Sequence, residues 1–471
     1  MRTIRSAIWI PLGASLALTS LAQSPPTPAQ RELREIYKEL VEIDTTDSAG
    51  SCTEAAQALA ARLKAAGFQA QDVQVIVPPN GPKKGNLVAR YRGTGAKKPI
   101  MLLGHLDVVE AKREDWQRDP FRLVEENGYL YARGAADDKA MVAVFTANLI
   151  RYRGESYRPE RDLIQVASCD EEIIPSKSSG IVYLLKNHRQ LIDAEFALNE
   201  GGTGLLDRNG NYLRMSFQAG EKVFQTYRLE VTNPGGHSAY PVKDNAITHL
   251  AGGLARLGAY DFPFKLSATT RAYFESMSRI ETGQTAADMK AILREPPDAE
   301  AIARLSAASP LNNSTFRTTC VATMLDAGHA TNALPQRARA TVNCRILPGE
   351  SVAEVQQTLA RVMADDKIRI TPTHEPTLSP PPPLSPEIVG PIEKVSAQMW
   401  PGVPVVPTML VAATDGRFTI NAGIPTYGVS GMFRDPEGGG VHGLNERIRV
   451  RSLYEGHEFL YRLVKLYGGG R

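Results

Sequence analysis

The sequence predicts an α/β fold with two parts, a larger domain on a central, mainly parallel sheet and an inserted, smaller α+β domain. Three observations lead to this prediction. In the N-terminal half, short apolar runs that favour strands alternate with segments of helical periodicity, which is typical of parallel sheets. In the middle of the chain, strands and helices follow the split βαβ order. A proline-rich run then leads back to one last strand and helix.

The first domain takes its elements from both ends of the chain. Gln30–Ile43 has apolar residues at helical spacing, and Thr53–Gly67 reads as a second helix with Thr53 as its N-cap. The remaining elements of this domain are strands at 86–91, 99–103, 162–169 and 426–429 and helices at 141–152 and 451–467. We therefore place this domain at residues 23–218 and 378–471.

The middle of the chain predicts a βαββαβ unit. Its elements are strands at 224–231, 316–325, 337–346 and 368–373, with helices at 244–257 and 352–363. The proline-rich run Ser379–Pro386 is better suited to a stiff connector than to a core. The inserted domain is therefore expected at 219–377, and residues 260–312 are expected to form a helical insertion within it, to which the sequence assigns no role.

Composition limits the class of protein. Lys and Arg number 54 against 51 Asp and Glu, a formal net charge of +3, which gives no electrostatic argument for a nucleic acid as partner. With 42% hydrophobic residues, the chain can bury sizeable cores. Its four cysteines are too few for a disulfide scaffold. Cys320 and Cys344 fall in two predicted strands and could face each other, whereas Cys169 is interpreted as a small core residue.

The N-terminus has the pattern of a secretory signal peptide. Two arginines precede an interrupted apolar run over residues 7–21. At its end, Ser20 and Ala22 provide small residues at the two positions that a signal peptidase recognises. We expect cleavage before Gln23, which removes residues 1–22 and makes the protein secreted or periplasmic. A retained anchor is the alternative, although the run is shorter than the roughly 20 apolar residues of a spanning helix. No membrane span is expected in the mature chain.

Histidines and carboxylates follow apolar, strand-like runs at five places. These are His105 with Asp107, Asp137 with Asp138, Asp170-Glu171-Glu172, Glu200 and His442. Each alone has an ordinary interpretation, such as a core histidine, a helix cap or a solvated turn. Together they would converge at the carboxyl ends of parallel strands, where ligands bind in this architecture. A mixed histidine and carboxylate set suits zinc, with cobalt or manganese as possible substitutes.

These motifs resemble the M20 metallopeptidase family. The resemblance begins in Gly104–Ala140, with His-Leu-Asp-Val-Val, Trp116, Asp-Pro-Phe and Arg-Gly-Ala-Ala-Asp-Asp-Lys. It continues through Asp170-Glu171-Glu172, Asn199-Glu200-Gly201-Gly202, Gly236-His237-Ser238, Asn332-Ala333-Leu334-Pro335, Thr414-Asp415-Gly416-Arg417 and His442. The order covers nearly all of the mature chain and is specific for the superfamily, but much less so for the substrate.

The resemblance implies a zinc-exopeptidase-like catalytic domain with two zinc ions per chain. His105 and Glu200 would hold one ion, Glu172 and His442 the other, and Asp137 would bridge both. Asp107 would orient His105, and Glu171 would be the general base beside the water that attacks the substrate. The family also has a cis peptide after its bridging aspartate, here Asp137–Asp138.

The inserted domain would correspond to the family's lid, which often also forms a dimer interface. His237 would stabilise the oxyanion, in many members from the partner subunit, while Asn332, Arg345 and Thr414 would hold the substrate and its carboxylate. These correspondences predict an exported di-zinc exopeptidase, a carboxypeptidase or dipeptidase. An N-acyl amino acid amidohydrolase of the aminoacylase kind is the alternative, and a non-catalytic peptide-binding protein is a remote one. The expected substrate is a small peptide or an N-acyl amino acid, and a homodimer through the inserted domain is possible.

Overall fold

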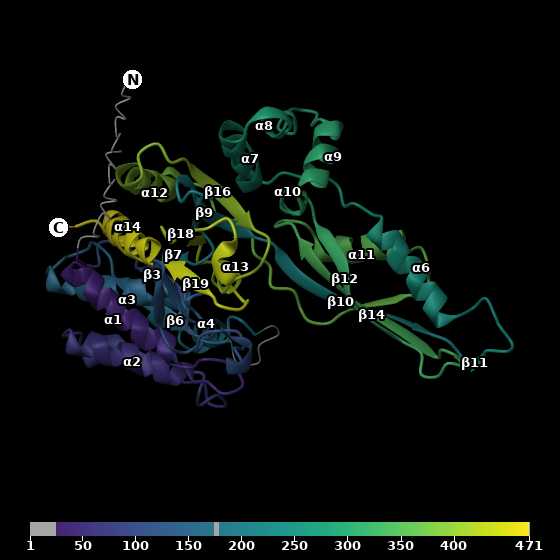
Figure 1. The fold of residues 1–471 in the computed structure, drawn as a ribbon, viewed down its shortest axis with the longest axis horizontal. Helices are drawn as coiled ribbons and strands as arrows, with labels where there is room; N and C mark the ends of the chain where they lie inside the picture. The colour runs from purple at the N-terminus through teal and green to yellow at the C-terminus, as the bar shows by residue number, and fades with distance from the viewer. Residues whose placement is uncertain (1–24, 174–178, 471) are drawn as a thin grey trace, which may run out of the picture.

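The computed structural model describes residues 25–173 and 179–470, which form two lobes (Figure 1). The larger lobe brings together the N-terminal helices in purple and the C-terminal helix in yellow. The second lobe, in teal and green, extends away from it and is elongated. The predicted signal segment lies outside the described residues. Among the helices that are described, none is both long and apolar enough to cross a bilayer.

The larger lobe is built on a ten-stranded sheet. Its strand order is β1-β2-β6-β3-β7-β17-β9-β8-β18, and β16 pairs with β9. The strands are β1 (Val73–Ile76), β2 (Asn86–Tyr91), β3 (Ile100–His105), β6 (Leu163–Ser168), β7 (Phe196–Asn199), β8 (Gly204–Leu206), β9 (Tyr212–Glu221), β16 (Val405–Leu410), β17 (Thr426–Gly428) and β18 (Phe433–Arg434). The four neighbours β6, β3, β7 and β17 run parallel, which confirms the predicted mainly parallel centre.

Helices pack on this sheet through apolar faces. They are α1 (Pro28–Glu42), α2 (Cys52–Ala65), α3 (Lys139–Gly154), α4 (Gly180–Asn187), α5 (Arg189–Ile192), α12 (Pro386–Met399), α13 (Gly416–Asn421) and α14 (Val450–Gly468). Helix α3 is buried along nearly its whole length, since it is apolar on most sides and lies between the sheet, α1 and α14. A small sheet of β4 (Val124–Glu126), β5 (Tyr129–Tyr131) and β19 (Arg447–Arg449) lies beside them.

The start of α2 differs from the prediction. Ser51, not Thr53, is the N-cap, because its side chain accepts a hydrogen bond from the Glu54 N–H. The Thr53 hydroxyl instead accepts from the Gly85 N–H and donates to the Pro82 carbonyl. Thr53 therefore ties the helix to the loop before β2.

The second lobe has the predicted βαββαβ order. Its elements are β10 (Val223–Thr232), α6 (Ala246–Gly258), β12 (Thr319–Ala327), β14 (Arg337–Ile346), α11 (Val352–Met363) and β15 (Arg369–Pro372). The four strands form an antiparallel sheet in the order β12-β14-β10-β15, and both helices share its apolar core. At the far tip, β11 (Gly236–His237) pairs with β13 (Ala333–Leu334) (Figure 1). The predicted bounds of the inserted domain, 219–377, stay a prediction.

The predicted helical insertion forms a separate block of four helices. These are α7 (Ala268–Ile280), α8 (Gly283–Ala291), α9 (Ala299–Ala308) and α10 (Pro310–Thr315). Their apolar cluster includes Val406 of β16, and the Thr269 hydroxyl donates to the Ala219 carbonyl of β9. The block therefore packs on the main sheet, above the junction of the two lobes in Figure 1.

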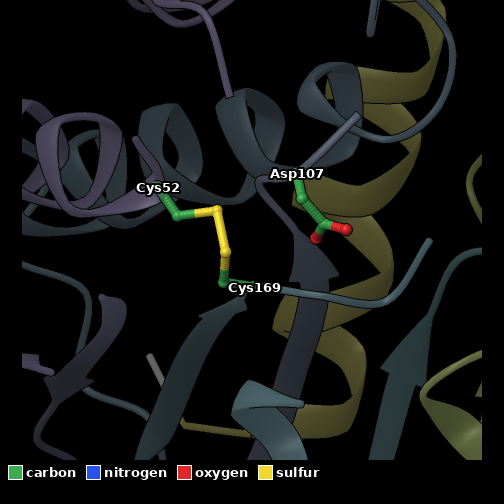
Figure 2. Close-up of side chains that lie close together, drawn as sticks. All are labelled: Cys52, Asp107 and Cys169. Carbon is green, nitrogen blue, oxygen red and sulfur yellow. A yellow bond between two sulfur atoms is a disulfide. The ribbon is translucent and has the colours of Figure 1, made fainter. Parts of the chain in front are cut away.

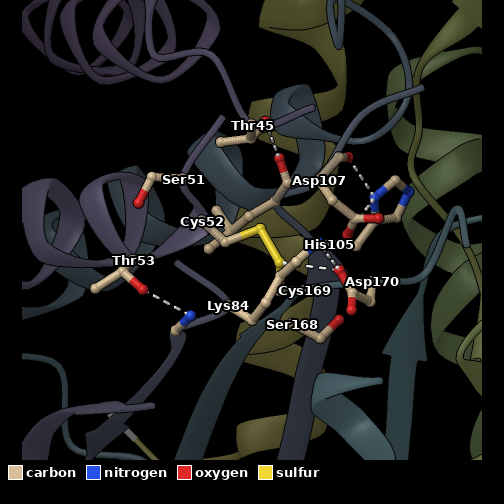
Figure 3. Close-up of a disulfide and its surroundings, with 12 residues drawn as sticks. Thr45, Ser51, Cys52, Thr53, Lys84, His105, Asp107, Ser168, Cys169 and Asp170 are labelled. Atoms are coloured by element: carbon tan, nitrogen blue, oxygen red, sulfur yellow. Dashed lines mark hydrogen bonds and ion pairs between the residues drawn. A yellow bond between two sulfur atoms is a disulfide. The ribbon is translucent and has the colours of Figure 1, made fainter. Parts of the chain in front are cut away.

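All four cysteines are paired. Cys320 and Cys344 lie directly opposite each other on β12 and β14, which confirms the pairing that the sequence left open. The interpretation of Cys169 as a plain core residue is wrong, because it is bonded to Cys52. The first turn of α2 packs against the end of β6, which brings the two Cα atoms to 6.1 Å, within the range of a disulfide (Figure 3).

Candidate metal centre

His105 is the last residue of β3, and its buried imidazole faces carboxylates. Its Nε2 lies 3.0 Å from Asp137 Oδ1 and 3.8 Å from Glu200 Oε1. Its Nδ1 lies 3.0 Å from the Asp107 carbonyl and 3.7 Å from Asp107 Oδ1. One nitrogen is thus fixed by residue 107, which leaves the other to face the two acids. Glu200 comes directly after β7, the neighbour of β3 in the sheet.

Asp137 stands between two histidines. While its Oδ1 faces His105, its Oδ2 lies 3.1 Å from Nε2 of His442, and that nitrogen is 2.8 Å from Glu172 Oε1. Burial alone would raise the pKa of Asp137, but hydrogen bonds to the two histidines outweigh it and hold the pKa below its usual range. The peptide bond from Asp137 to Asp138 is cis, as the resemblance implied.

Asp107 supports the acidic loop after β6. Its two carboxylate oxygens accept hydrogen bonds from the backbone N–H groups of Glu171, at 3.2 Å, and Glu172, at 3.0 Å. Figure 3 shows Asp107 beside His105 and close to the end of β6. Asp107 therefore contacts the histidine mainly through its carbonyl and holds two further candidate residues through its carboxylate.

The centre gathers more negative charge than its own histidines offset. Burial, and then the charge of nearby acids, raise the pKa of Glu200 well above its ordinary value. Burial likewise raises the pKa of Glu171. Among the described residues, Glu171 Oε1 is buried without a hydrogen-bond partner. Buried carboxylates of this kind are stabilised by a nearby cation.

The donor set suits divalent metal ions, and the residues form two groups that share Asp137. One group comprises His105, Asp137 and Glu200, and the other His442, Asp137 and Glu172. Within these groups, the separations from the histidine Nε2 atoms to the nearest carboxylate oxygens run from 2.8 to 3.8 Å. Tetrahedral ligands at zinc distances are about 3.4 Å apart, so these separations are compatible with metal ligation. The sixth candidate, Glu171, has a carboxylate oxygen within 4.8 Å of the ligand atoms of His105 and Glu200.

A second grouping of metal-ligand residue types is not a metal site. Cys52, Cys169 and Asp107 lie close together, as Figure 2 shows. The two sulfur atoms are bonded to each other, so neither is a thiolate that could bind an ion. The disulfide instead fixes the residue that precedes the acidic loop.

Thr414 lines a cavity of about 350 Å³ together with the candidate residues Asp137, Glu171, Glu172, Glu200 and His442. Its N–H and its hydroxyl both donate to Glu221 Oε2, at 2.8 and 3.1 Å. Asn199, the last residue of β7, donates to the same hydroxyl. Thr414 is thereby fixed between the main sheet and the residue at which β9 ends.

Three predicted residues lie away from the metal centre. His237 and Asn332 are exposed at the far tip of the second lobe, where the Ser238 N–H donates to the Asn332 carbonyl (Figure 1). Arg345 is paired with Phe224 in the register of β14 and β10, near the junction of the lobes. The structure thus brings together the predicted metal residues, Asp107, Glu171 and Thr414, but not His237, Asn332 and Arg345.

Sequence reasoning missed Glu446. Its buried carboxylate accepts hydrogen bonds from the N–H groups of Gly134, Ala136 and Asp137, and it pairs with Arg133 at 2.8 Å. Glu446 therefore shapes the turn that presents Asp137. A signal was available in the sequence, since Glu446 lies four residues after His442 and ends the same short motif. Its role, however, comes from contacts with residues more than 300 positions earlier in the chain, which the motif alone does not indicate.

Comparisons with known proteins identify the family of this chain. The sequence profile of Peptidase family M20/M25/M40 matches residues 101–466. The N-fatty-acyl-amino acid synthase/hydrolase PM20D1 of Mus musculus is 28% identical over 382 residues, which cover 78% of this chain and 74% of that protein. The probable carboxypeptidase S-like 2 of Dictyostelium discoideum is 27% identical over 390 residues, 81% of this chain and 74% of that one.

Solved structures share the fold. The M20 family metallo-carboxypeptidase Sso-CP2 from Sulfolobus solfataricus aligns with a TM-score of 0.70 at 19% identity, over 93% of this chain and 99% of that one. The dipeptidase Dug1p from Saccharomyces cerevisiae aligns with a TM-score of 0.64 at 16% identity, over 93% and 96% of the two chains. The chain therefore belongs to Peptidase family M20/M25/M40, and it is a hydrolytic enzyme that acts on amide bonds.

Proposed function

We propose that the protein is an exported di-zinc exopeptidase that removes an amino acid with a free carboxylate from the end of a small peptide. The observation that supports it best is Asp137, whose two carboxylate oxygens face His105 and His442 in opposite directions. A carboxylate placed in this way can bridge two ions. His105 and Glu200 would complete one site, and His442 and Glu172 the other.

Two zinc ions held there would lower the pKa of a water and polarise the scissile carbonyl. Glu171 takes the proton from the attacking water and delivers it to the leaving amine, since its carboxylate has an oxygen within 4.8 Å of ligand atoms of His105 and Glu200 and its Oε1 has no hydrogen-bond partner among the described residues. Asp107 keeps Glu171 in place through the backbone N–H of that residue. Glu446 does the same for Asp137.

Thr414 would form the wall against which the substrate carboxylate lies, since its own N–H and hydroxyl are donated to Glu221, and Arg345 of the lid would be the cationic partner of that carboxylate. Arg345 lies on the strand that reaches the lobe junction, so closure of the second lobe would bring it toward the cavity. His237 and Asn332 would serve a site from the far tip of that lobe, which is consistent with a contribution from a partner subunit. These four roles rest on the family resemblance and on this placement.

An N-acyl amino acid amidohydrolase is the second candidate. The similarity to PM20D1, an N-fatty-acyl-amino acid synthase/hydrolase, favours it. Both candidates share the amide and the amino acid with a free carboxylate, and they differ only in the group on the acyl side. A panel of dipeptides, N-blocked peptides and N-acyl amino acids, offered to zinc-loaded protein, shows which bond is cleaved.

Two matched variants test the centre itself. Glu171→Gln should keep about two metal ions per chain and lose 10²-fold or more in kcat, because proton transfer is removed and the ligands are not. Asp137→Asn should lose metal as well as activity. Glu300→Gln, whose side chain is 89% exposed in the helical block, serves as the control. Metal content by mass spectrometry and turnover on the cleaved substrate are measured together.

Normal turnover in Glu171→Gln, or full metal content in Asp137→Asn, would contradict the assignment. Tight peptide binding without turnover in the wild type would instead favour a peptide-binding protein.

Export and dimerisation each have a supporting observation. The two disulfides pair all four cysteines, as is usual in an oxidising compartment. Edge strand β12 exposes Val321, Met324 and Leu325, at 58, 69 and 66% of their surface. An apolar edge strand of this kind is a surface for pairing with a second chain. We therefore propose β12 as the interface of a homodimer formed through the inserted domain.

A further inference from the structure

A second cavity, of about 220 Å³, opens off the metal centre toward the helical block. It shares Gly201, Thr203, Leu410 and Arg434 with the cavity that holds the metal residues. Because Gly201 directly follows the candidate ligand Glu200, a molecule bound at the metal centre can extend into this second space. The residues of the proposed mechanism do not line it.

The sheet places two arginines on the floor of this cavity. Leu205 of β8 is the register partner of Arg214 on one side and of Arg434 on the other. Residues paired across strands point to the same face of a sheet. Arg214 and Arg434 therefore flank Leu205 on one face, and all three line the cavity.

Neither arginine has a carboxylate partner among the described residues. Arg214 donates to the Ser216 hydroxyl and contacts the Met277 sulfur, and Arg434 forms no side-chain hydrogen bond within that part of the chain. Asp435, the next residue along the chain, instead accepts hydrogen bonds from Arg449 and Tyr129. Burial, and then the charge of Arg214, lower the pKa of the Arg434 guanidinium.

Two other arginines near the centre differ, because each has a carboxylate partner. Arg133, near the other side of the centre, is paired with Glu446, and Arg449 with Asp435. Two neighbouring guanidinium groups that lack a counter-charge repel each other, and an anion between them removes that repulsion. Guanidinium groups also recognise carboxylates well, since they can form two parallel hydrogen bonds.

The remaining walls combine apolar side chains, among them Tyr273 of α7, Leu311 of α10 and Met409 of β16, with the hydroxyl groups of Ser216, Thr315 and Thr408. The cavity thus suits a short hydrocarbon stem that ends in a negative charge.

We propose that Arg214 and Arg434 bind a carboxylate on the acyl side of the substrate, and that the helical block forms the wall of this subsite. The inference rests on the proposed function, in which Arg345 takes the carboxylate of the released amino acid beside Thr414. The preferred substrate then carries a carboxylate at each end, with the scissile amide between them. The helical block gains a role as a determinant of acyl-side specificity.

Paired substrates test this subsite. N-succinyl-, N-glutaryl- and N-adipoyl-leucine are each compared with a neutral analogue of the same shape, the 4-methylpentanoyl, 5-methylhexanoyl or 6-methylheptanoyl compound. In the wild type, kcat/KM should be higher for the charged member of at least one pair. Arg434→Gln and Arg214→Gln should each reduce that preference at least tenfold through KM, while neutral substrates change less than threefold.

Binding is measured separately from activity. Isothermal titration of metal-free protein with the same compounds should show tighter binding of the charged member, and this difference should vanish in Arg434→Gln. Arg208→Gln, an exposed arginine in the turn between β8 and β9, is the control and should keep the preference. Arg434→Lys should restore part of it, and this variant also serves if Arg434→Gln does not fold.

The outcomes separate the two proposals. Hydrolysis of neutral and charged members at equal rates, with equal binding, overturns the subsite and leaves the amide hydrolase standing. Binding that depends on the arginines, without hydrolysis of any amide, supports the subsite and contradicts the proposed reaction. A charge preference that survives in both arginine variants also overturns the subsite.

Discussion

The Cys52–Cys169 disulfide should contribute more to stability than any other single link in the larger lobe. It joins the first residue of α2 to the residue that follows β6, and both cysteines are almost fully buried. We consider the double variant Cys52→Ala/Cys169→Ala, with Cys320→Ala/Cys344→Ala as the matched control in the second lobe.

The magnitude follows from the length of chain that each bond closes. The Cys52–Cys169 bond spans 117 residues and the Cys320–Cys344 bond spans 24. In the chain-entropy model, these loops correspond to about 5 and about 3.5 kcal/mol of unfolding free energy. The first pair should therefore cost roughly 1.5 kcal/mol more than the second, because the unfolded chain regains more freedom.

Tryptophan fluorescence during urea unfolding is the appropriate assay. After removal of the predicted signal peptide, the tryptophans of the chain are Trp116 and Trp400, both buried in the larger lobe. The fluorescence midpoint should fall strongly in Cys52→Ala/Cys169→Ala. It should fall less in the control, whose main effect should appear in the circular dichroism of the second lobe. A loss below about 1 kcal/mol for the first pair, or the reverse order, would refute the reasoning.

Three further predictions concern packing, pH and assembly. A Cβ at Gly104 would lie 2.7 Å from Asp138 Oδ2, so Gly104→Ala should lower the unfolding free energy by about 1–3 kcal/mol. Gly154 has open space around it, so Gly154→Ala should leave the unfolding free energy nearly unchanged. Equal denaturation curves for the two variants would contradict this prediction. Burial raises the pKa of Glu221 from its ordinary 4.5 to about 7. Between these two values the folded protein keeps a proton on Glu221 that the unfolded chain has lost. The free energy of unfolding should therefore fall by about 2–3 kcal/mol as the pH rises from 5 to 8. Glu221→Gln should remove that part of the pH dependence in denaturation measured at both values, and an unchanged slope would count against it. Met324→Arg should convert a dimer to a monomer in light scattering, and a wild type that is monomeric would exclude the β12 interface.

Local patterns in the sequence were sufficient for most of the fold. The strand over 337–346 and the helix over 352–363 have the predicted bounds, because alternation and helical spacing are properties of a few neighbouring residues. The placement of His105 and Glu200 at adjacent strand ends follows from the same logic, since parallel strands end at one edge.

Contacts between distant segments could not be predicted in this way. Cys169 lies in a buried-strand pattern whether or not Cys52 is near, so only the tertiary structure, which brings their Cα atoms to 6.1 Å, reveals the bond. The helical block has no sequence feature that directs it to Val406 of the main sheet. His237 belongs to a recognisable motif, yet its distance from the metal residues depends on the length of the second lobe.

The passage from one lobe to the other has a mechanical consequence. Strand β9 ends at Glu221 and β10 begins at Val223, so extended backbone crosses the boundary with a single residue between the two strands. Thr414 is bonded through its N–H and hydroxyl to the Glu221 carboxylate at that crossing. A rotation of the second lobe would therefore be transmitted through Glu221 to Thr414 and would displace one wall of the metal-site cavity. Binding of a substrate in that cavity and the orientation of the second lobe are thus mechanically coupled.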